Sequence, residues 1–177
     1  MRKSMFLLFV LLLSIKAMSQ NKTDTSYYIQ ACQDKMTDKK YAFGSKSLLC
    51  TENGKKGFKI SISWQNKNDE ITYSGFTVTS AGIGTCNEND ELILLFEDDS
   101  KLKFTSWNKF NCEGNSYFDL YGKSLDEISS KKVKTIRFIN GRTFDSYTYE
   151  VPERNQAYFI QAKYALENKI IKNTSCD

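Results

Sequence analysis

Residues 91–106 read ELILLFEDDSKLKFTS, in which two largely apolar runs flank a polar turn at 98–100. Two short runs of this kind around a tight polar turn predict an antiparallel β-hairpin. If Glu97 faces Lys101, the numbers of facing residues sum to 198. Apolar side chains then meet on one face of the hairpin, as sheet pairing favours. The facing apolar pairs are Phe96 with Leu102 and Leu94 with Phe104.

Short strands are predicted on both sides of this hairpin. Residues 58–64 alternate between apolar and polar side chains, which is the period-2 pattern of a half-buried strand. Residues 70–80 are rich in β-branched and aromatic residues, and their apolar phase shifts at Gly75, which indicates a bulge. A further short strand is expected at 116–121, and the stretch at 124–130 that follows it is polar.

A second hairpin is predicted between residues 133–139 and 142–151. The two runs are joined by Asn140-Gly141, a dipeptide that tolerates the positive φ angles of a type I′ turn. In a two-residue turn of this type, Asp145 would face Ile136.

The C-terminal part of the chain has a helical pattern over about 153–171. Pro152 suits the first turn of a helix, and Glu153 favours the positive end of the helix dipole. The residues at helical spacing are Tyr158, Phe159, Ala162, Ala165, Leu166 and Lys169, with Arg154, Gln161, Lys163 and Glu167 facing away. We expect the apolar stripe of this helix to pack on the sheet.

These patterns predict one mainly β (α+β) domain over residues 20–177. Seven to nine short strands would form an antiparallel sheet, a sandwich or a partly open barrel, with one amphipathic helix at the C-terminus. No linker rich in Pro, Gly or Ser divides the chain.

Residues 1–19 are predicted to be a cleavable export signal. Arg2 and Lys3 precede an apolar run from 5 to 15, and the small residues Ala17 and Ser19 precede the cleavage point before Gln20. The apolar run has 11 residues, whereas a membrane-spanning helix needs about 20 residues. We therefore expect a periplasmic or extracellular protein with no membrane insertion after cleavage.

Cleavage would change the charge of the chain. The full chain has 25 basic and 21 acidic residues, and the signal holds three of the basic ones, so the net charge falls from +4 to +1. A near-neutral chain lacks the concentrated positive field that nucleic acids require, and we expect no nucleic-acid partner. The Ser-Gln cleavage point and the abundance of Lys, Asn, Ser, Ile and Phe resemble those of small exported proteins of the Bacteroidota, which implies a compartment and no activity.

All five cysteines lie beyond the predicted signal, in a chain whose compartment favours disulfides. The register of the 91–106 hairpin, continued outward, places Cys86 opposite Cys112, and we predict a disulfide between them. Glycines at 82, 84 and 114 leave this outer register open. Cys32 and Cys50 are the next candidate pair, which would leave Cys176 as an unpaired thiol in the tail.

The chain has no histidine, the usual acid or base at neutral pH and the commonest ligand of transition metals. Serine or cysteine triads that depend on histidine are therefore excluded, and we expect no metal, cofactor or catalytic residues. Residues 82–84 lack the lysine and third glycine of a phosphate-binding loop. The acidic clusters 88–91 and 97–99 lie in polar turns, where solvated side chains are the usual outcome.

Four residues are candidates for a binding surface. In the predicted register, Asp145 lies on the same side as Tyr147 and Tyr149, and aromatic rings beside a polar group are typical of surfaces that bind sugars or peptides. Trp107 is the fourth candidate. The alternative is that the tyrosine rings cover the core beneath the C-terminal helix.

Three functions are compatible with these patterns. The first is an exported, non-enzymatic protein that binds a protein partner, such as an immunity protein or an inhibitor of a hydrolase. The second is a carbohydrate-binding module that uses Tyr147, Tyr149 or Trp107 to bind a glycan. The third is a hydrolase without histidine that acts through the carboxylates of Glu88, Asp90 or Asp145.

Overall fold

The computed structural model describes residues 26–52, 55–67, 70–84, 86–120 and 123–176, so the predicted signal lies outside the described residues. The mainly β fold is confirmed, with a helix near the C-terminus. The described elements are β1 Ile29–Gln33, β2 Lys40–Gly44, β3 Leu48–Glu52, β4 Lys56–Lys67, β5 Glu70–Ala81, β6 Glu91–Phe96, β7 Lys101–Thr105, β8 Asn115–Asp119, α2 Lys123–Ser130, β9 Val133–Ile139, β10 Ser146–Glu150, the 3-10 turn Glu153–Asn155, α3 Tyr158–Glu167 and β11 Ile171–Asn173.

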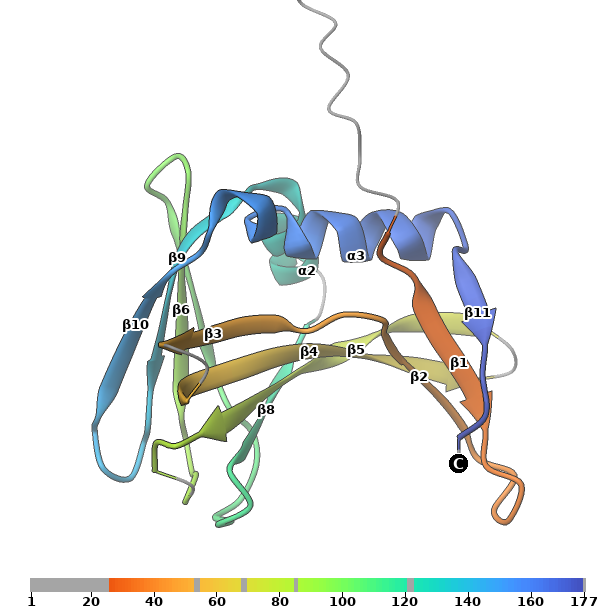
Figure 1. The fold of residues 1–177 in the computed structure, drawn as a ribbon, viewed down its shortest axis with the longest axis horizontal. Coiled ribbons are helices and arrows are strands. Elements are labelled where there is room, and N and C mark those ends of the chain that lie inside the picture. The colour runs from red at the N-terminus through yellow and green to blue at the C-terminus, as the bar shows by residue number, and fades with distance from the viewer. Residues whose placement is uncertain (1–25, 53–54, 68–69, 85, 121–122, 177) are drawn as a thin grey trace, which may run out of the picture.

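The strands form two sheets that do not close into a barrel (Figure 1). The larger sheet has seven strands in the order β11-β1-β2-β4-β5-β8, with β3 paired to β4, and the smaller sheet has the order β10-β9-β6-β7. All these pairs are antiparallel except β1 with β11. In Figure 1, α2 and α3 lie above the larger sheet and the smaller sheet stands across one end of it.

The core lies between the two sheets and the helices. Phe58 of β4 contacts Phe138 of β9 with ring centroids 5.6 Å apart, and Phe76 of β5 meets Phe104 of β7 edge to face at 5.2 Å. The alternation predicted at 58–64 therefore directs its apolar face into this core. Gly75 pairs with Ser63 at a register shift in the β4–β5 ladder, which confirms the predicted bulge.

The C-terminal helix is shorter than predicted. It ends at Glu167, because Lys169 adopts a positive φ of 51°, and the chain continues as β11. The predicted helix over 153–171 was therefore wrong at both ends, although its apolar stripe is buried in the core as expected. The polar stretch at 124–130 folds as α2, and its Ile128 is fully buried. No helix within the described residues has the length and apolar character needed to cross a bilayer.

The 91–106 hairpin forms with a different register. Leu95 pairs with Lys101 and Leu92 with Phe104, so the numbers of facing residues sum to 196. The turn lies one residue earlier than predicted, at 97–99, because the Phe96 N–H donates to the Ser100 carbonyl at 3.0 Å. A shift of two residues keeps every side chain on its predicted face.

The predicted disulfide between Cys86 and Cys112 is confirmed, and the separate pairing of Asn87 with Asn111 explains why. The chain segment from Thr105 to Asn111 is two residues longer than the segment from Asn87 to Glu91 that faces it. The numbers of facing residues therefore sum to 196 in the hairpin but to 198 at Asn87 and Asn111. Cys86 therefore lies opposite Cys112 as predicted, because these two shifts cancel.

The predicted pair of Cys32 and Cys50 was wrong. Cys32 bonds to Cys176, and Cys50 is a buried free thiol. The physical reason is topological: β11 lies beside β1 and carries the tail to Cys32, whereas Cys50 sits on β3 opposite Phe58 and points into the core. Cys176 is therefore not the unpaired tail thiol that the sequence predicted.

Candidate functional site

Three loops lie together at one end of the two sheets, at the lower left of Figure 1. The first loop is 82–90, the second is 106–114 and the third is 140–145. We call them the braced loop end, because a disulfide and hydrogen bonds join the first loop to the second and to the third. Loops held on a rigid scaffold are common places for binding residues.

The first and second loops are joined covalently. The disulfide between Cys86 and Cys112 links them, and Asn87 and Asn111 beside it exchange two backbone hydrogen bonds of 2.7 and 3.1 Å. Two loops tied at adjacent positions in this way lose most of their freedom to move apart.

Asp90 lies at the centre of the loop end and is fully buried. Its Oδ2 accepts hydrogen bonds from the Asn87 side-chain amide at 2.9 Å and from the Ser116 hydroxyl, and its Oδ1 accepts the Gly141 N–H at 2.8 Å. Its backbone groups bond to Ser106. The carboxylate of Asp90 therefore joins the first and third loops to strand β8, and both of its oxygens are used. Its backbone adds the second loop through Ser106.

Asn140 braces the third loop from the other side. Its Oδ1 accepts the N–H groups of Arg142 and Thr143 at 2.9 and 3.0 Å, and its Nδ2 donates to the Cys86 carbonyl at 3.0 Å. The predicted two-residue turn at Asn140-Gly141 was therefore wrong. The connection spans 140–145 and contains Phe144 at a φ of 61°.

This longer loop also changes the predicted place of Asp145. Tyr149 faces Ile136, and Asp145 lies before the first ladder pair of β10 and is exposed. The predicted facing of Asp145 and Ile136 was wrong, because six residues separate the two strands where the pattern of Asn-Gly suggested two.

Gly141 is required here by close packing rather than by its φ angle. A Cβ at this position would lie 2.1 Å from the Glu88 carbonyl oxygen and 2.5 Å from that of Asn89. Backbone atoms cannot move aside cheaply, so we expect Gly141→Ala to lower the free energy of unfolding by about 2–3 kcal/mol. Urea unfolding checks this value.

Gly84→Ala is the matched control for this substitution. It lies in the first loop of the same loop end, and its nearest neighbour would be the Asn140 Nδ2 at 3.9 Å, which is ordinary contact. We expect it to unfold at the wild-type urea concentration. Equal losses from the two alanines would show that Gly141 is not held by close packing.

Three aromatic side chains project from the braced loop end into solvent. Trp107 is 62 % exposed, Phe110 51 % and Phe144 79 %. Arg142 lies over the Phe110 ring, 4.6 Å from its centroid, and its Nη1 is 3.3 Å from a Glu88 carboxylate oxygen. Burying a large aromatic side chain stabilises a protein by about 1.5–3 kcal/mol, so three exposed rings on one braced end point to a surface that is covered on binding.

Trp107 also rests on a neighbouring ring. Its centroid lies 5.4 Å from that of Tyr117 on β8, with 30° between the two planes. The backbone N–H of Trp107 donates to the Tyr117 carbonyl at 3.0 Å. Trp107 is therefore held in position although it is exposed.

The four predicted binding residues fall in two places. Trp107 and Asp145 belong to the braced loop end, in its second and third loops. Tyr147 and Tyr149 lie on β10, half-buried against the core and lining a small cavity beside β3 rather than beneath the C-terminal helix. Burial and the nearby Asp145 carboxylate raise the pKa of Tyr147.

Sequence reasoning missed Phe110, Arg142 and Phe144. Phe110 stands in a polar loop without periodicity, where a single aromatic residue carries no signal of exposure. Arg142 and Phe144 fall within the predicted strand 142–151, whereas the observed strand β10 begins only at Ser146. It also treated the acids at 88–91 as solvated, which was wrong for Asp90, because Asn87, Ser116 and Gly141 donate to its carboxylate inside the loop end.

The remaining acids of the two clusters behave as ordinary surface groups. Glu91 pairs with Lys103 at 2.6 Å, and hydrogen bonds from Ser100 and then Lys131 lower the pKa of Asp98 to about 2. Within the described part of the chain, no group of three cysteine or acidic side chains is placed to hold a metal ion. Comparison of the chain with protein-family models, with curated proteins and with solved structures finds no match.

Proposed function

We propose that this chain is an exported, non-enzymatic binding protein whose braced loop end recognises a protein partner. The observation that carries the proposal is the set of exposed rings of Trp107, Phe110 and Phe144 on loops that are braced from beneath. Neutralisation of the partner, as by an immunity protein or an inhibitor, is the form of this function that we favour.

The chemistry of the surface supports a protein partner. Tryptophan and arginine are the residues most enriched among the few that supply most of the binding energy at protein interfaces. Arg142 carries its charge over the Phe110 ring and beside Glu88, so it presents both an apolar and a polar face to a partner. Polar groups around apolar side chains are the usual arrangement of an interface core and its rim.

The bracing supports the same proposal. A binding surface that is already ordered loses less conformational entropy on association, and the affinity gained in this way does not require extra contact area. Buried Asp90 and the disulfide of Cys86 with Cys112 hold the loops in place. We therefore expect tight binding from a small surface.

The proposal is tested by capture of partners from the native envelope with immobilised mature chain, followed by affinity measurement on the partner recovered. We expect a stoichiometric protein partner, and we expect Trp107→Ala and Phe144→Ala each to weaken its binding about 30-fold, which corresponds to about 2 kcal/mol. The thermal midpoints of these variants should match the wild type, because both side chains are exposed.

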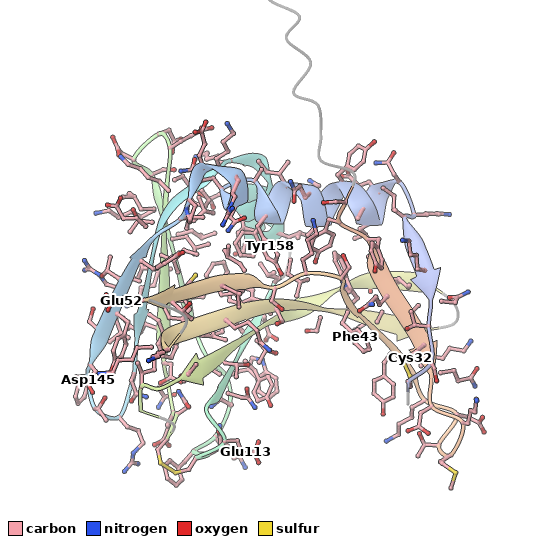
Figure 2. All side chains as sticks on the ribbon, viewed as in Figure 1. Cys32, Phe43, Glu52, Glu113, Asp145 and Tyr158 are labelled. Atoms are coloured by element: carbon pink, nitrogen blue, oxygen red, sulfur yellow. A yellow bond between two sulfur atoms is a disulfide. The ribbon has the colours of Figure 1, made fainter. Side chains whose placement is uncertain are left out.

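Phe43→Ala is the control variant. Phe43 is also an exposed aromatic residue, 41 % accessible, but it lies on β2, on the underside of the larger sheet and away from the braced loop end (Figure 2). It should retain wild-type affinity. Full binding by the Trp107→Ala, Phe144→Ala double variant would contradict the proposal.

A glycan is the second candidate ligand, and the contact of Trp107 with Tyr117 favours it. Tyr117 holds the exposed indole of Trp107 in one orientation, and a fixed aromatic ring of this kind can stack on the apolar face of a sugar ring. A glycan array decides between the candidates. Binding that is lost in Trp107→Ala and in Tyr117→Ala would support the glycan, and a blank array would remove it.

A further inference from the structure

Two strands that each have one unpaired edge meet where the two sheets come together. Within the described residues, β10 pairs with β9 and β3 pairs with β4, and neither has a second ladder partner. The two strands lie against one another on the left of Figure 1, and the Glu52 end of β3 reaches toward β10 in Figure 2. We call the space between them the β3–β10 cleft.

The open edge of β10 can be assigned residue by residue. The Asn140 N–H donates to the Asp145 carbonyl, and the Val151 N–H donates to the Lys134 carbonyl, both at 2.9 Å. Bonding alternates along an antiparallel strand, so these two bonds direct the backbone groups of residues 147 and 149 toward β9. The N–H and C=O groups of Ser146 and Thr148 therefore point away from β9, toward the cleft.

A small cavity opens between the strands. Its volume is about 180 Å³, and its lining includes Phe58, Tyr147, Tyr149 and Cys50. Burial raises the pKa of the Cys50 thiol, which keeps it protonated and neutral. Pockets for drug-sized ligands have volumes of about 300–1,000 Å³, so this cavity suits one or two side chains rather than a whole small molecule.

The charges at the cleft select the kind of side chain. Glu52 and Lys56 are the charged residues of its lining, and they face one another across the β3–β4 hairpin, so the cleft has no net charge. Aromatic rings and a neutral thiol make the interior suited to an apolar side chain. Because the charges of Glu52 and Lys56 offset one another, the cleft favours neither sign of charge in an occupant.

We propose that the β3–β10 cleft binds an extended segment of another polypeptide, which adds as a strand to the open edge of β10 and places an apolar side chain in the cavity. Unpaired edges bind peptides in this way because the backbone supplies the hydrogen bonds and the pockets supply specificity. This site is separate from the braced loop end, and the proposal does not depend on the function proposed for that end.

The probe is a library of random linear dodecapeptides displayed on phage, selected against the full mature chain and followed by synthesis of the peptides recovered. We expect peptides that share an apolar position. Bound to the unmodified chain, they should slow amide exchange at Ser146 and Thr148 at least tenfold, whereas the amides of 147 and 149 are already bonded to β9. This readout requires no variant.

Thr148→Pro removes the outward N–H, and edge strands tolerate proline where the N–H faces away from the ladder. We expect it to weaken peptide binding at least tenfold. The matched control, Thr148→Ala, also loses the hydroxyl that accepts from Arg137 Nε but keeps the N–H, and it should bind within about twofold of the wild type. If Thr148→Pro does not fold, Ser146→Pro and Ser146→Ala form the second pair.

Three results would overturn the proposal. The first is the selection of no peptide that protects the amides of Ser146 and Thr148. The second is peptide binding that is lost in Trp107→Ala, which would place the peptide at the braced loop end. The third is a dimer that protects β10 without any peptide, which would make a second copy of the chain the occupant. Peptide binding that persists in Trp107→Ala separates this proposal from the function proposed above.

Discussion

Asp90→Ala is expected to lower the free energy of unfolding by about 4 kcal/mol. The substitution leaves the Asn87 amide, the Ser116 hydroxyl and the Gly141 N–H with no acceptor in a buried place. Each buried donor that loses its partner costs roughly 1–3 kcal/mol, and water entering the space left by the carboxylate recovers part of the total.

Urea unfolding with both disulfides intact measures this loss. Glu113→Ala is the control, since Glu113 also lies in the second loop but its side chain is exposed. Figure 2 labels Glu113 at its lower edge. It should change the free energy of unfolding by less than about 0.5 kcal/mol. A loss below about 1 kcal/mol in Asp90→Ala would show that the carboxylate does not brace the loops.

Asp90→Asn separates the hydrogen bonds from the volume of the side chain. The amide has the size of the carboxylate. Both oxygens of Asp90 accept hydrogen bonds, so in either orientation of the amide its NH₂ group faces a donor and at least one hydrogen bond is lost. We expect a loss between those of the control and of Asp90→Ala. The affinity for the partner should fall with it, since the third loop is anchored to Asp90 through Gly141.

Removal of the disulfide between Cys32 and Cys176 is expected to be the most destabilising change to a single cross-link in the described structure. The two cysteines are 144 residues apart, so the bond restricts almost the whole unfolded chain. The chain-entropy relation gives about 5 kcal/mol for a loop of this length. The Cys32→Ala, Cys176→Ala double variant, unfolded in urea, measures the loss.

The other disulfide provides the comparison. Cys86 and Cys112 are 26 residues apart, for which the same relation gives about 3.5 kcal/mol. The Cys86→Ala, Cys112→Ala variant should therefore lose less stability, but it should lose more affinity for a partner of the braced loop end. If the Cys32→Ala, Cys176→Ala variant lost less stability than this variant, the bond would be holding only the tail segment β11.

The candidate site was only partly predictable. Asp145 was predicted as a binding residue because it shares a face with Tyr147 and Tyr149 in the predicted strand, and Trp107 because aromatic rings are typical of binding surfaces. The burial of Asp90 instead depends on Ser116 and Gly141, which are 26 and 51 residues away in the sequence. Nothing near Asp90 in the sequence distinguishes it from the exposed acids around it. A buried acid is recognised by its partners, and these come from other strands.

The sequence by itself determined the strand faces, both hairpins and the apolar stripe of the C-terminal helix, because side-chain alternation and helical spacing are local properties that burial on one side enforces. The tertiary structure decided the lengths of the turns, the partner of Cys32 and the role of Asp90. These depend on which strands become neighbours, and β1 beside β11 joins residues 144 apart. Local patterns show which side of a strand is buried, but only the packed sheets determine what lies against it.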